Sequence, residues 1–373
     1  MLKQKLLIYG AGAIGRGYIP WVYPPDLYDY YYVESNIALR EALNQRGEFT
    51  SFMATGGAYE ALIVPVVKCF EPGAEVSILP DIAGIVTCVG PRNFPTLDYL
   101  FKSIKVPVIC CENDANLPRE MRDRTGNPNI VFAIPDVITS STASEDLLLK
   151  DPLALITEAG TFFADEQASL LKGNCSYVSK EELAIQWAAK LYIHNTPHCI
   201  AAYLGNILGV RYLHETMQYP EADKVVEGAM LEMERMLQHS ENISHEFLRF
   251  YSKKELSRFR NKLLFDPILR VAREPFRKLA PNDRLIGAAQ RCLSSGIVPK
   301  YLTLGIMAAF CFDSMEDPDA HIKYLLNSLQ PVEFLRTIIR LNETEALSDI
   351  LLKNWKLNLE IIAGLKNEKR KIA

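Results

Sequence analysis

The chain has 373 residues, of which 49% are hydrophobic and 23% are charged, and its formal net charge is −4. This ordinary globular composition excludes a disordered, collagen-like or small disulfide-stapled chain, and the length suits about two to three domains. The charge balance makes a dedicated binder of nucleic acid or of membrane surfaces a poor first hypothesis, because such proteins are usually basic.

Cysteine usage and hydropathy indicate the compartment. No two of the eight cysteines stand at C-x-x-C spacing, and most lie in apolar runs, which predicts reduced thiols and no zinc site. Glycines interrupt the first apolar run at once, so no signal peptide is expected. Later apolar stretches, around 199–210 and 302–312, are shorter than the ~20 residues that span a bilayer. We therefore expect a cytoplasmic protein with neither a membrane partner nor a bound metal.

Short apolar runs alternate with helical stretches in the first half of the chain. Six runs are expected to be strands: 6–9, 30–33, 61–67, 84–89, 106–111 and 130–134. Continuous apolar strands separated by helices predict a parallel sheet covered on both faces. One intervening helix has clear ends, with Ser35 as its expected N-cap and Gly47 as its stop.

The pattern changes near residue 179. Ser179 precedes two acidic residues, as expected at a helix start, and β-branched runs become rare. Amphipathic helical patterns cover most of 181–209, 221–240, 243–264, 283–294, 300–312 and 332–365. The sequence therefore predicts an α/β chain: a doubly wound, Rossmann-type nucleotide domain at 1–178 and a mainly α-helical substrate domain at 179–373.

A glycine-rich turn follows the first predicted strand. Residues 5–17 read KLLIYGAGAIGRG, which places G-x-G-x-x-G directly after that strand. The first glycine permits a tight turn, the second lets backbone approach a pyrophosphate, and the third lets helix and strand pack closely. The helix N-terminus then attracts the phosphates. The predicted cofactor-binding residues of this turn are Gly10, Ala11, Gly12, Ala13, Ile14 and Gly15. The alternative is a glycine turn without a ligand.

Glu34 ends the second predicted strand, where a carboxylate accepts ribose hydroxyls and repels a 2′-phosphate. NAD is therefore favoured over NADP, and the alternative for Glu34 is an ordinary strand-end carboxylate. Pro20 falls inside the expected first helix and should kink or end it. Arg16 is expected either near phosphates or substrate, or as a solvated helix residue.

The helical half opens with the pattern K-x4-N-x2-H, formed by Lys190, Asn195 and His198. A desolvated lysine can remove the hydroxyl proton during hydride transfer, while an amide and an imidazole hold the reacting oxygen. The alternative is that these are ordinary polar residues of an amphipathic helix, and His194 is assigned to that alternative. Pro197 either kinks the helix or starts a new one capped by Thr196.

The stretch KLYIHNTPHCIAAYLG (190–205) resembles the signature of the polyol-specific long-chain dehydrogenases, the mannitol dehydrogenase family. Further stretches resemble that family in the same order: GAGAIGRGYI (10–19), VGP (89–91), CEN (111–113) and REPFRKLAPNDRLIGA (273–288). The last is similar to the branch that acts on mannitol 1-phosphate. The resemblance spans residues 5 to about 312, and several ordered motifs are more specific than any one of them.

This resemblance implies a zinc-free, NAD-dependent oxidoreductase with Lys190 as general base and with Asn195 and His198 around the substrate oxygen. It also implies that Asn113 lies at the cofactor and Asp136 at the substrate, and that Lys300 is a second active-site lysine. The chain departs from the family pattern where Val137 follows Asp136 and where Ser140 and Ser141 replace prolines. These departures leave the reaction class in place and bear on the substrate. The active site is expected in the cleft between the two domains.

Residues 252–284 contain ten basic and four acidic residues, an excess that points to an anionic ligand. Arg277, Lys278 and Arg284 are the candidates for binding a phosphate, and the alternative is a solvated helix face. The resemblance to the branch that acts on mannitol 1-phosphate favours mannitol 1-phosphate and fructose 6-phosphate as the substrate pair. The alternatives are a mannitol 2-dehydrogenase, a fructuronate or tagaturonate reductase, or a non-catalytic NAD-binding regulator. No nucleic-acid partner is expected, and the sequence does not determine the oligomeric state.

Overall fold

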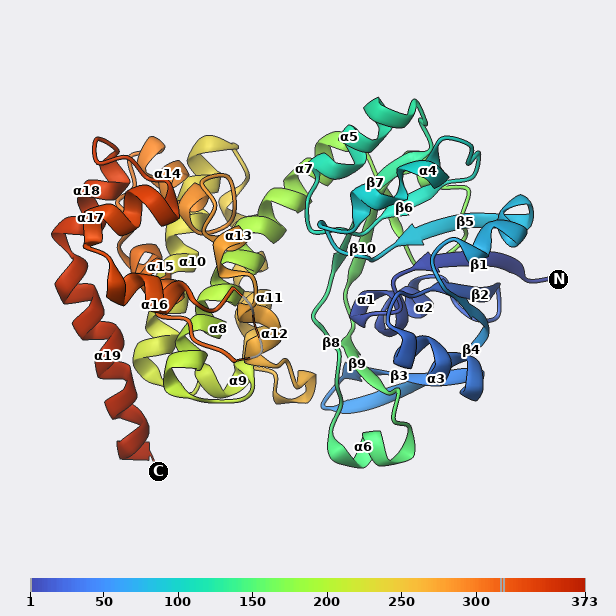
Figure 1. The fold of residues 1–373 in the computed structure, drawn as a ribbon, viewed down its shortest axis with the longest axis horizontal. Helices are drawn as coiled ribbons and strands as arrows, with labels where there is room; N and C mark the ends of the chain where they lie inside the picture. The colour runs from blue at the N-terminus through green and yellow to red at the C-terminus, as the bar shows by residue number, and fades with distance from the viewer. Residues whose placement is uncertain (1, 316, 318, 373) are drawn as a thin grey trace. The chain divides into compact units, whose positions relative to one another are not determined.

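A computed structural model describes residues 2–315, 317 and 319–372, with side chains described to residue 365. The chain forms two compact units, Met1–Trp187 with Leu263–Phe265 and Ala188–Lys262 with Asp266–Ala373 (Figure 1). The unit boundary lies at 187/188, compared with the domain boundary predicted at 178/179. The nucleotide and substrate roles of the two parts remain predictions.

The first unit is built around one sheet. Its strands are β1 (Gln4–Tyr9), β2 (Tyr28–Val33), β3 (Glu48–Thr55), β4 (Ala58–Phe70), β5 (Ile82–Thr87), β6 (Val108–Cys110), β7 (Ile130–Asp136), β8 (Thr139–Ser140), β9 (Leu155–Glu158), β10 (Thr161–Asp165) and β11 (Ser176–Val178). Its helices are α1 (Ala13–Gly17), α2 (Ile19–Val22), α3 (Ile37–Arg46), α4 (Asp98–Phe101), α5 (Asn116–Thr125) and α6 (Glu145–Lys150), and α7 (Lys180–Ala189) runs across the unit boundary. Short 3₁₀ turns are η1 (Ala74–Asp81), η2 (Phe94–Leu97) and η3 (Glu166–Ala168).

The strand order is β11-β10-β7-β6-β5-β1-β2-β4-β3-β9-β8. Strand β1 pairs in parallel with β2 on one side and with β5 on the other, so the chain reverses its direction of winding at β1. In open α/β sheets, ligands bind at the carboxyl ends of the strands beside such a reversal. All six predicted strands are present, and the glycine turn follows β1 at this reversal point.

The sheet is mixed, which corrects the expectation of parallel pairing throughout. Strands β3 and β4 form an antiparallel hairpin, and β10 is antiparallel to β7. The hairpin turns at Gly56 and Gly57, both with positive φ, as a two-residue connection requires. The T-G-G-A sequence at this turn was therefore a hairpin signal that the strand prediction did not use.

Alternate residues of β1 point into two different cores. Leu6 and Ile8 belong to one buried cluster, whereas Leu7 and Tyr9 belong to another. A strand buried on both sides has no polar face, which explains its continuous apolar sequence. The prediction that the sheet is covered on both faces is confirmed.

Local capping explains several helix ends. Helix α3 is capped by Asn36, whose side chain accepts from the Leu39 amide at 3.0 Å, so the prediction of Ser35 was wrong by one position. Gly47 ends the helix in the left-handed conformation, as predicted. The Ser179 hydroxyl accepts from the Glu182 amide at 3.3 Å at the start of α7. Helix α1 ends before Pro20, which lies in the first turn of α2, as its missing amide hydrogen requires.

The second unit is helical. It comprises the π-helix η4 (Lys190–Asn195), α8 (Thr196–Leu208), α9 (Leu213–Thr216), α10 (Pro220–Ser240), α11 (His245–Phe259), α12 (Ile268–Ala272), α13 (Pro275–Lys278), α14 (Ile286–Ser294), α15 (Lys300–Phe310), α16 (Ile322–Ser328), α17 (Pro331–Phe334), the π-helix η6 (Leu335–Ile339), α18 (Ala346–Lys353) and α19 (Trp355–Ile372). The 3₁₀ turn η5 (Lys262–Leu264) precedes α12.

Helix α8 is the buried centre of this unit, and it packs against α10, α12, α15 and α19 (Figure 1). The predicted helix over 332–365 is divided, because Arg340 adopts the left-handed conformation and the chain turns before α18 begins. Among the described residues, no helix has the length and apolar character needed to cross a membrane.

Candidate active site

The glycine turn has the steric properties that its sequence predicts. Gly10 has φ +91°, and a Cβ atom there would lie 2.5 Å from the Cys88 carbonyl oxygen. A Cβ atom on Gly15 would lie 2.0 Å from the Gly10 carbonyl oxygen, so the helix and the turn pack as closely as backbone allows. A Cβ atom on Gly12 would meet nothing within 4 Å. The turn is therefore tightly packed at Gly10 and Gly15 and open at Gly12. It lies at the carboxyl end of β1, where a dinucleotide pyrophosphate fits.

Glu34 lies against this turn. One carboxylate oxygen accepts from the Ala11 amide at 2.9 Å and the other from the Asn36 amide at 2.8 Å. The oxygen that Asn36 faces also accepts from the Ser35 hydroxyl at 3.4 Å. The oxygen that Ala11 faces keeps a lone pair for a further donor, such as a ribose hydroxyl. Arg16 is not a solvated helix residue, because its buried guanidinium donates to the carbonyl oxygens of Ala11 at 2.5 Å and Leu153 at 2.7 Å.

The carboxyl ends of β5 and β6 are joined by a buried carboxyl group that sequence reasoning missed. Glu112 accepts from the Thr87 hydroxyl at 2.7 Å and from the Val89 amide at 3.1 Å. Burial raises its pKa to about 8. Asn113, the next residue, is exposed, and Asp136 is buried at the end of β7. Within the CEN motif only Asn113 was predicted as a site residue. Glu112, directly before it, was the signal that could have indicated this buried carboxyl group.

Two of the departures from the family pattern have packing roles. Val137 is buried in the first unit's core. The Ser140 hydroxyl donates to the Phe265 carbonyl oxygen at 2.8 Å.

Lys190 and Asn195 lie at the ends of a π-helical segment. Pro197 has no amide hydrogen to donate to the carbonyl group four residues earlier, and the chain widens into η4 just before it. The angular positions expected from an ideal α-helix therefore do not apply here. Thr196 does not cap α8, because its hydroxyl bonds the carbonyl oxygens of Leu191 and Arg284.

The three residues of the K-x4-N-x2-H pattern are all buried. Lys190 is 5% exposed, Asn195 6% and His198 9%. The Asn195 side-chain nitrogen has no hydrogen-bond partner among the described residues. A buried amide donor without a partner costs free energy, so its retention suits a ligand oxygen.

Each histidine of this segment is paired with a carboxylate from a distant part of the chain. His198 Nε2 lies 2.7 Å from Asp266 Oδ2, and His194 Nδ1 bonds the buried Glu255. Burial lowers the pKa of His198 to about 4. Burial opposes ionisation of Asp266, but Arg270 and His198 hold its pKa at about 2.

Asp266 and Glu255 were not among the predicted site residues. Asp266 stands four residues before Arg270, which donates to its Oδ1 from Nε at 3.1 Å and from Nη2 at 2.5 Å. That i, i+4 spacing was a visible signal for an ion pair, although it could not reveal the histidine.

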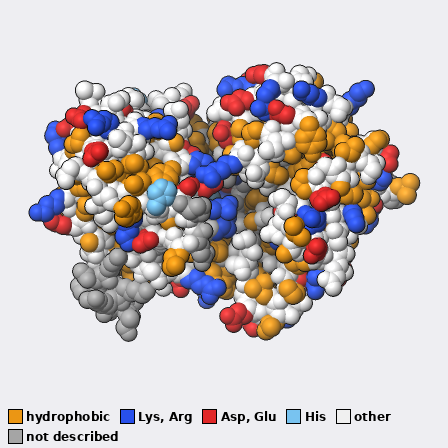
Figure 2. Space-filling view, viewed as in Figure 1, with side chains coloured by type: hydrophobic (Ala, Val, Ile, Leu, Met, Phe, Trp, Pro, Cys, Tyr) orange, Lys and Arg blue, Asp and Glu red, His pale blue; other side chains and the backbone are white. Residues whose placement is uncertain are grey.

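The basic segment 252–284 contains less free positive charge than its composition suggests. Arg260 pairs with Asp223 and Glu227 of α10, and Arg258 pairs with Glu255. On the face drawn in Figure 2, acidic and basic side chains are interspersed on each unit. Acids of α10 therefore neutralise part of the local charge excess.

The three predicted phosphate residues do lie in one region of the second unit. Arg277 pairs with Glu274 at 2.8 Å and Asp283 at 3.1 Å, and Arg284 also pairs with Asp283 at 2.8 Å. Lys278 is buried and donates to the carbonyl oxygens of Val271 and Arg273. Burial, with Arg284 nearby, lowers its pKa to about 7.

Lys300 is the residue that the resemblance predicts as a second active-site lysine. It is exposed at the start of α15, with its ammonium group 5.4 Å from the centre of the Tyr301 ring. Of these two lysines, Lys278 is the one with the buried environment and lowered pKa expected of an active-site amine.

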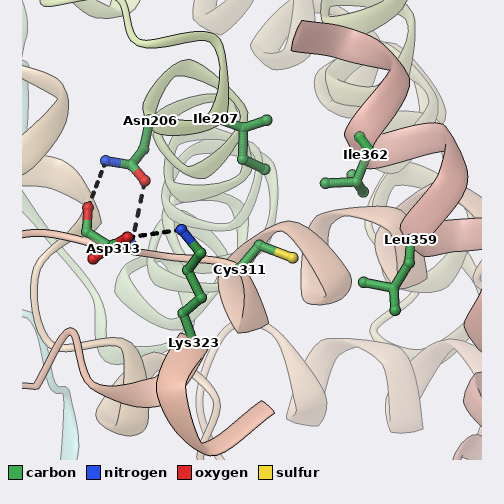
Figure 3. A pocket seen from close by; sticks show the side chains of 8 residues that line it. Asn206, Ile207, Cys311, Asp313, Lys323, Leu359 and Ile362 are labelled. Carbon is green, nitrogen blue, oxygen red and sulfur yellow. Dashed lines mark hydrogen bonds and ion pairs between the residues drawn. The ribbon is translucent and has the colours of Figure 1, made fainter. Parts of the chain in front are cut away.

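A cavity of about 480 Å³ lies near the C-terminal end of α8 (Figure 3). Asn206, Asp313 and Lys323 form a hydrogen-bonded polar side, and Ile207 and Ile362 are on its apolar side. None of the predicted site residues lines this cavity. Asn206 is eight residues beyond His198, or about 12 Å along the helix. Among the described residues, no group of three or more His, Cys, Asp or Glu could hold a metal ion.

A Rossmann-type sheet with a glycine-rich turn after its first strand defines the class of dinucleotide-binding proteins, and here a helical unit follows it. The comparisons agree. Residues 186–336 match the mannitol dehydrogenase C-terminal domain. The mannitol-1-phosphate 5-dehydrogenase of Bacillus licheniformis is 30% identical over 94% of this chain and 99% of its own length. That of Bacillus subtilis is 28% identical over 94% and 99%.

Among solved structures, the Pseudomonas fluorescens mannitol 2-dehydrogenase, in complex with NAD and D-mannitol, superposes with a TM-score of 0.73. It is 15% identical, and the match covers 99% of this chain and 92% of that one. The chain belongs to the mannitol dehydrogenase family.

Proposed function

We propose that the protein catalyses the reversible, NAD-dependent oxidation of a polyol, with mannitol 1-phosphate and fructose 6-phosphate as its substrate pair. The observation that carries this proposal is the buried set of Lys190, Asn195 and His198 in a chain that is 30% identical to a mannitol-1-phosphate 5-dehydrogenase along nearly its whole length. A polyol dehydrogenase needs such a proton-transfer set, whereas a regulator that only binds NAD does not.

The first unit has the residues to hold NAD, which supplies the hydride acceptor when bound. The open space over Gly12 suits the pyrophosphate, and α1 begins at Ala13, so the amides of its first turn lie at this space. Glu34 is placed to accept a ribose hydroxyl and would repel a 2′-phosphate. Asn113, exposed after β6, is proposed as a further cofactor contact.

The second unit has the proton-transfer residues. Oxidation of an alcohol carbon requires its hydroxyl proton to leave as the carbon–hydrogen bond breaks. We assign that proton to the Lys190 amine, which must be neutral to accept it. The unpartnered Asn195 Nδ2 donates to the same substrate oxygen and stabilises negative charge on it.

The phosphate is assigned to Arg277, Lys278 and Arg284. Arg277 pairs with Glu274 and Asp283, and Arg284 pairs with Asp283. The buried Lys278 ammonium donates to the carbonyl oxygens of Val271 and Arg273. The Tyr203 hydroxyl is buried and has no hydrogen-bond partner within the part of the chain that the structure describes. An incoming phosphate would take hydrogen bonds from these groups. Asp136 and Lys300 remain proposed substrate contacts on the resemblance alone.

Steady-state assays distinguish the alternatives. NAD reduction is measured with mannitol 1-phosphate and with mannitol, and NADH oxidation is measured with fructuronate and tagaturonate. The proposal predicts the highest kcat/KM for mannitol 1-phosphate. A preference for mannitol or for a uronate would identify the corresponding alternative activity. Absence of turnover with all four, while NAD still binds, would favour a regulator.

Replacement of Arg277 tests the phosphate assignment. R277A should raise KM for mannitol 1-phosphate by about 10- to 100-fold, because a charge-assisted bond contributes about 1.5–3 kcal/mol, and should leave KM for mannitol unchanged. R260A is the matched control, since Arg260 belongs to the same basic segment but pairs with α10. An equal rise in KM for both substrates in R277A would show that the phosphate binds elsewhere.

The eight cysteines are free thiols, which supports the expectation of a reducing, cytoplasmic environment.

A further inference from the structure

The orientation of His198 is set from outside the helix that carries it. Asp266 lies two residues before α12 and 68 residues further along the chain than His198, and its Oδ2 is 2.7 Å from His198 Nε2. Its other oxygen, Oδ1, accepts two bonds from Arg270, from Nε at 3.1 Å and Nη2 at 2.5 Å. The two carboxylate oxygens therefore have different partners, and neither is free to exchange roles.

Stacking restrains the imidazole ring further. The ring lies parallel to Phe259, with an interplanar angle of 9° and a centroid distance of 5.2 Å. The His194 ring lies 4.9 Å away on the same helix. With Nε2 held by Asp266 and the ring plane held by Phe259, His198 has one orientation.

The partner also selects the tautomer. Asp266 is buried and ionised, so it can only accept, and the hydrogen of the shared bond belongs to His198 Nε2. A neutral imidazole with its hydrogen on Nε2 has a lone pair on Nδ1. No described group bonds to Nδ1, and the side chain retains 11% exposure.

We propose that Asp266, itself held by Arg270, is a positioning residue that keeps His198 in the Nε2–H form, so that Nδ1 accepts a hydrogen bond from a substrate hydroxyl. This inference rests on the proposed polyol dehydrogenase activity and changes the part that His198 plays in it. Asn195 Nδ2 donates to the reacting oxygen, whose proton passes to Lys190, and His198 Nδ1 accepts from a second, neighbouring hydroxyl of the polyol. Within this pair, stabilisation of an oxyanion then falls to Asn195, because a lone pair on Nδ1 repels negative charge.

The substitution Asp266→Asn reverses the tautomer without changing the shape of the side chain. Arg270 is a donor only, so the amide oxygen of the variant must face Arg270 and the amide nitrogen must face His198. That nitrogen donates, which obliges His198 Nε2 to accept and moves the ring hydrogen to Nδ1. Nδ1 then cannot accept from a substrate hydroxyl.

The tautomer is measured directly by long-range ¹H–¹⁵N correlation spectra of protein labelled in its six histidines, with H198Q identifying the resonance. We expect the wild type at neutral pH to have Nε2 protonated and Nδ1 unprotonated, and D266N to have the reverse. The variant should lose about 10²- to 10⁴-fold in kcat, the range known for a wrong-tautomer histidine, with NAD affinity unchanged.

Glu255→Gln is the matched control. It replaces the carboxyl group that bonds a buried histidine of the same helical segment with an amide of the same shape, but His194 is outside the proton-transfer set. E255Q should lower the unfolding temperature, leave the His198 tautomer as in the wild type and change kcat by less than about tenfold. Equal losses of kcat in E255Q and D266N, with one His198 tautomer in both, would reduce Asp266 to a structural role and overturn the proposal.

The wild-type spectrum decides the question even if D266N does not fold. A wild-type His198 with its hydrogen on Nδ1 would overturn this inference and leave the polyol dehydrogenase proposal standing. A wild-type Nε2–H tautomer in a protein that turns over no polyol would refute the proposed activity and preserve the role of Asp266 in orienting the ring.

Discussion

Replacement of Gly12 by alanine and replacement of Gly15 by alanine should have different effects on the protein. An alanine Cβ at Gly12 meets nothing within 4 Å, and the backbone there, at φ −77° and ψ −159°, is extended and open to alanine. An alanine Cβ at Gly15 would lie 2.0 Å from the carbonyl oxygen of Gly10, a backbone atom that cannot move aside alone. G12A therefore tests the nucleotide site, and G15A tests the fold.

The magnitudes follow from these contacts. In G12A the methyl group stands where a pyrophosphate would approach the turn, and loss of one or two amide bonds to a charged phosphate costs about 3 kcal/mol. NAD should therefore bind at least about 100-fold more weakly. The unfolding temperature should remain within about 2 °C of the wild type, since alanine also lowers the entropy of the unfolded chain. In G15A, overpacking of about 3 kcal/mol should lower it by roughly 6–12 °C.

Calorimetric titration with NAD gives the dissociation constant, and differential scanning calorimetry gives the unfolding temperature of each variant. An unchanged NAD affinity in G12A would refute the assignment of the turn to the pyrophosphate. An unfolding temperature in G15A equal to that of the wild type would refute the packing argument. If G12A lost NAD affinity only together with its stability, the loss would not identify a nucleotide site.

Two further replacements test groups whose burial the structure shows. K190M should lower kcat by at least about 10³-fold while NAD affinity, measured by calorimetry, stays within about twofold, because a methionine fills the space without accepting a proton; a near-normal kcat would refute the base assignment. E112Q should stabilise the protein at high pH. Folded Glu112 keeps its proton up to about pH 8 whereas the unfolded carboxyl releases it near 4.5, so the folded state binds more protons and wild-type stability falls as pH rises between these values. Denaturant titrations should show that the free energy of unfolding of the wild type falls relative to that of E112Q by up to about 1.4 kcal/mol per pH unit across this window. Parallel pH profiles of the two proteins would show that Glu112 ionises normally.

The elements that sequence patterns predicted well are those governed by neighbours in the chain. The run before Gly10 is apolar at every position because β1 is buried on both faces. The glycine turn, the stop at Gly47 and the interruption at Pro20 each follow from the allowed conformations of one or two residues. Ser35 and Asn36 show the limit of this reasoning, since both can cap a helix and a shift of one position decides between them.

The sequence could not predict which charged groups pair with each other in the fold. The basic excess over 252–284 suggested free cations, but α10 supplies acids that neutralise Arg260. Lys278 was predicted at a phosphate and Lys300 as a second active-site lysine, and only packing made the first buried and left the second exposed. Burial depends on which helices surround a side chain, and that surrounding is assembled from segments far apart in the chain.

The sequence by itself determined the α/β character of the first half, the glycine turn after β1, the helical second half and the spacing of Lys190, Asn195 and His198. These properties depend on backbone sterics and on the period of apolar residues, which act over a few positions. Only the tertiary structure decided that Lys190 and Asn195 lie in a π-helical turn and that Asp266 faces His198. A hydrogen bond between residues 68 positions apart exists only after the helices that carry them have packed, so no local pattern could predict it.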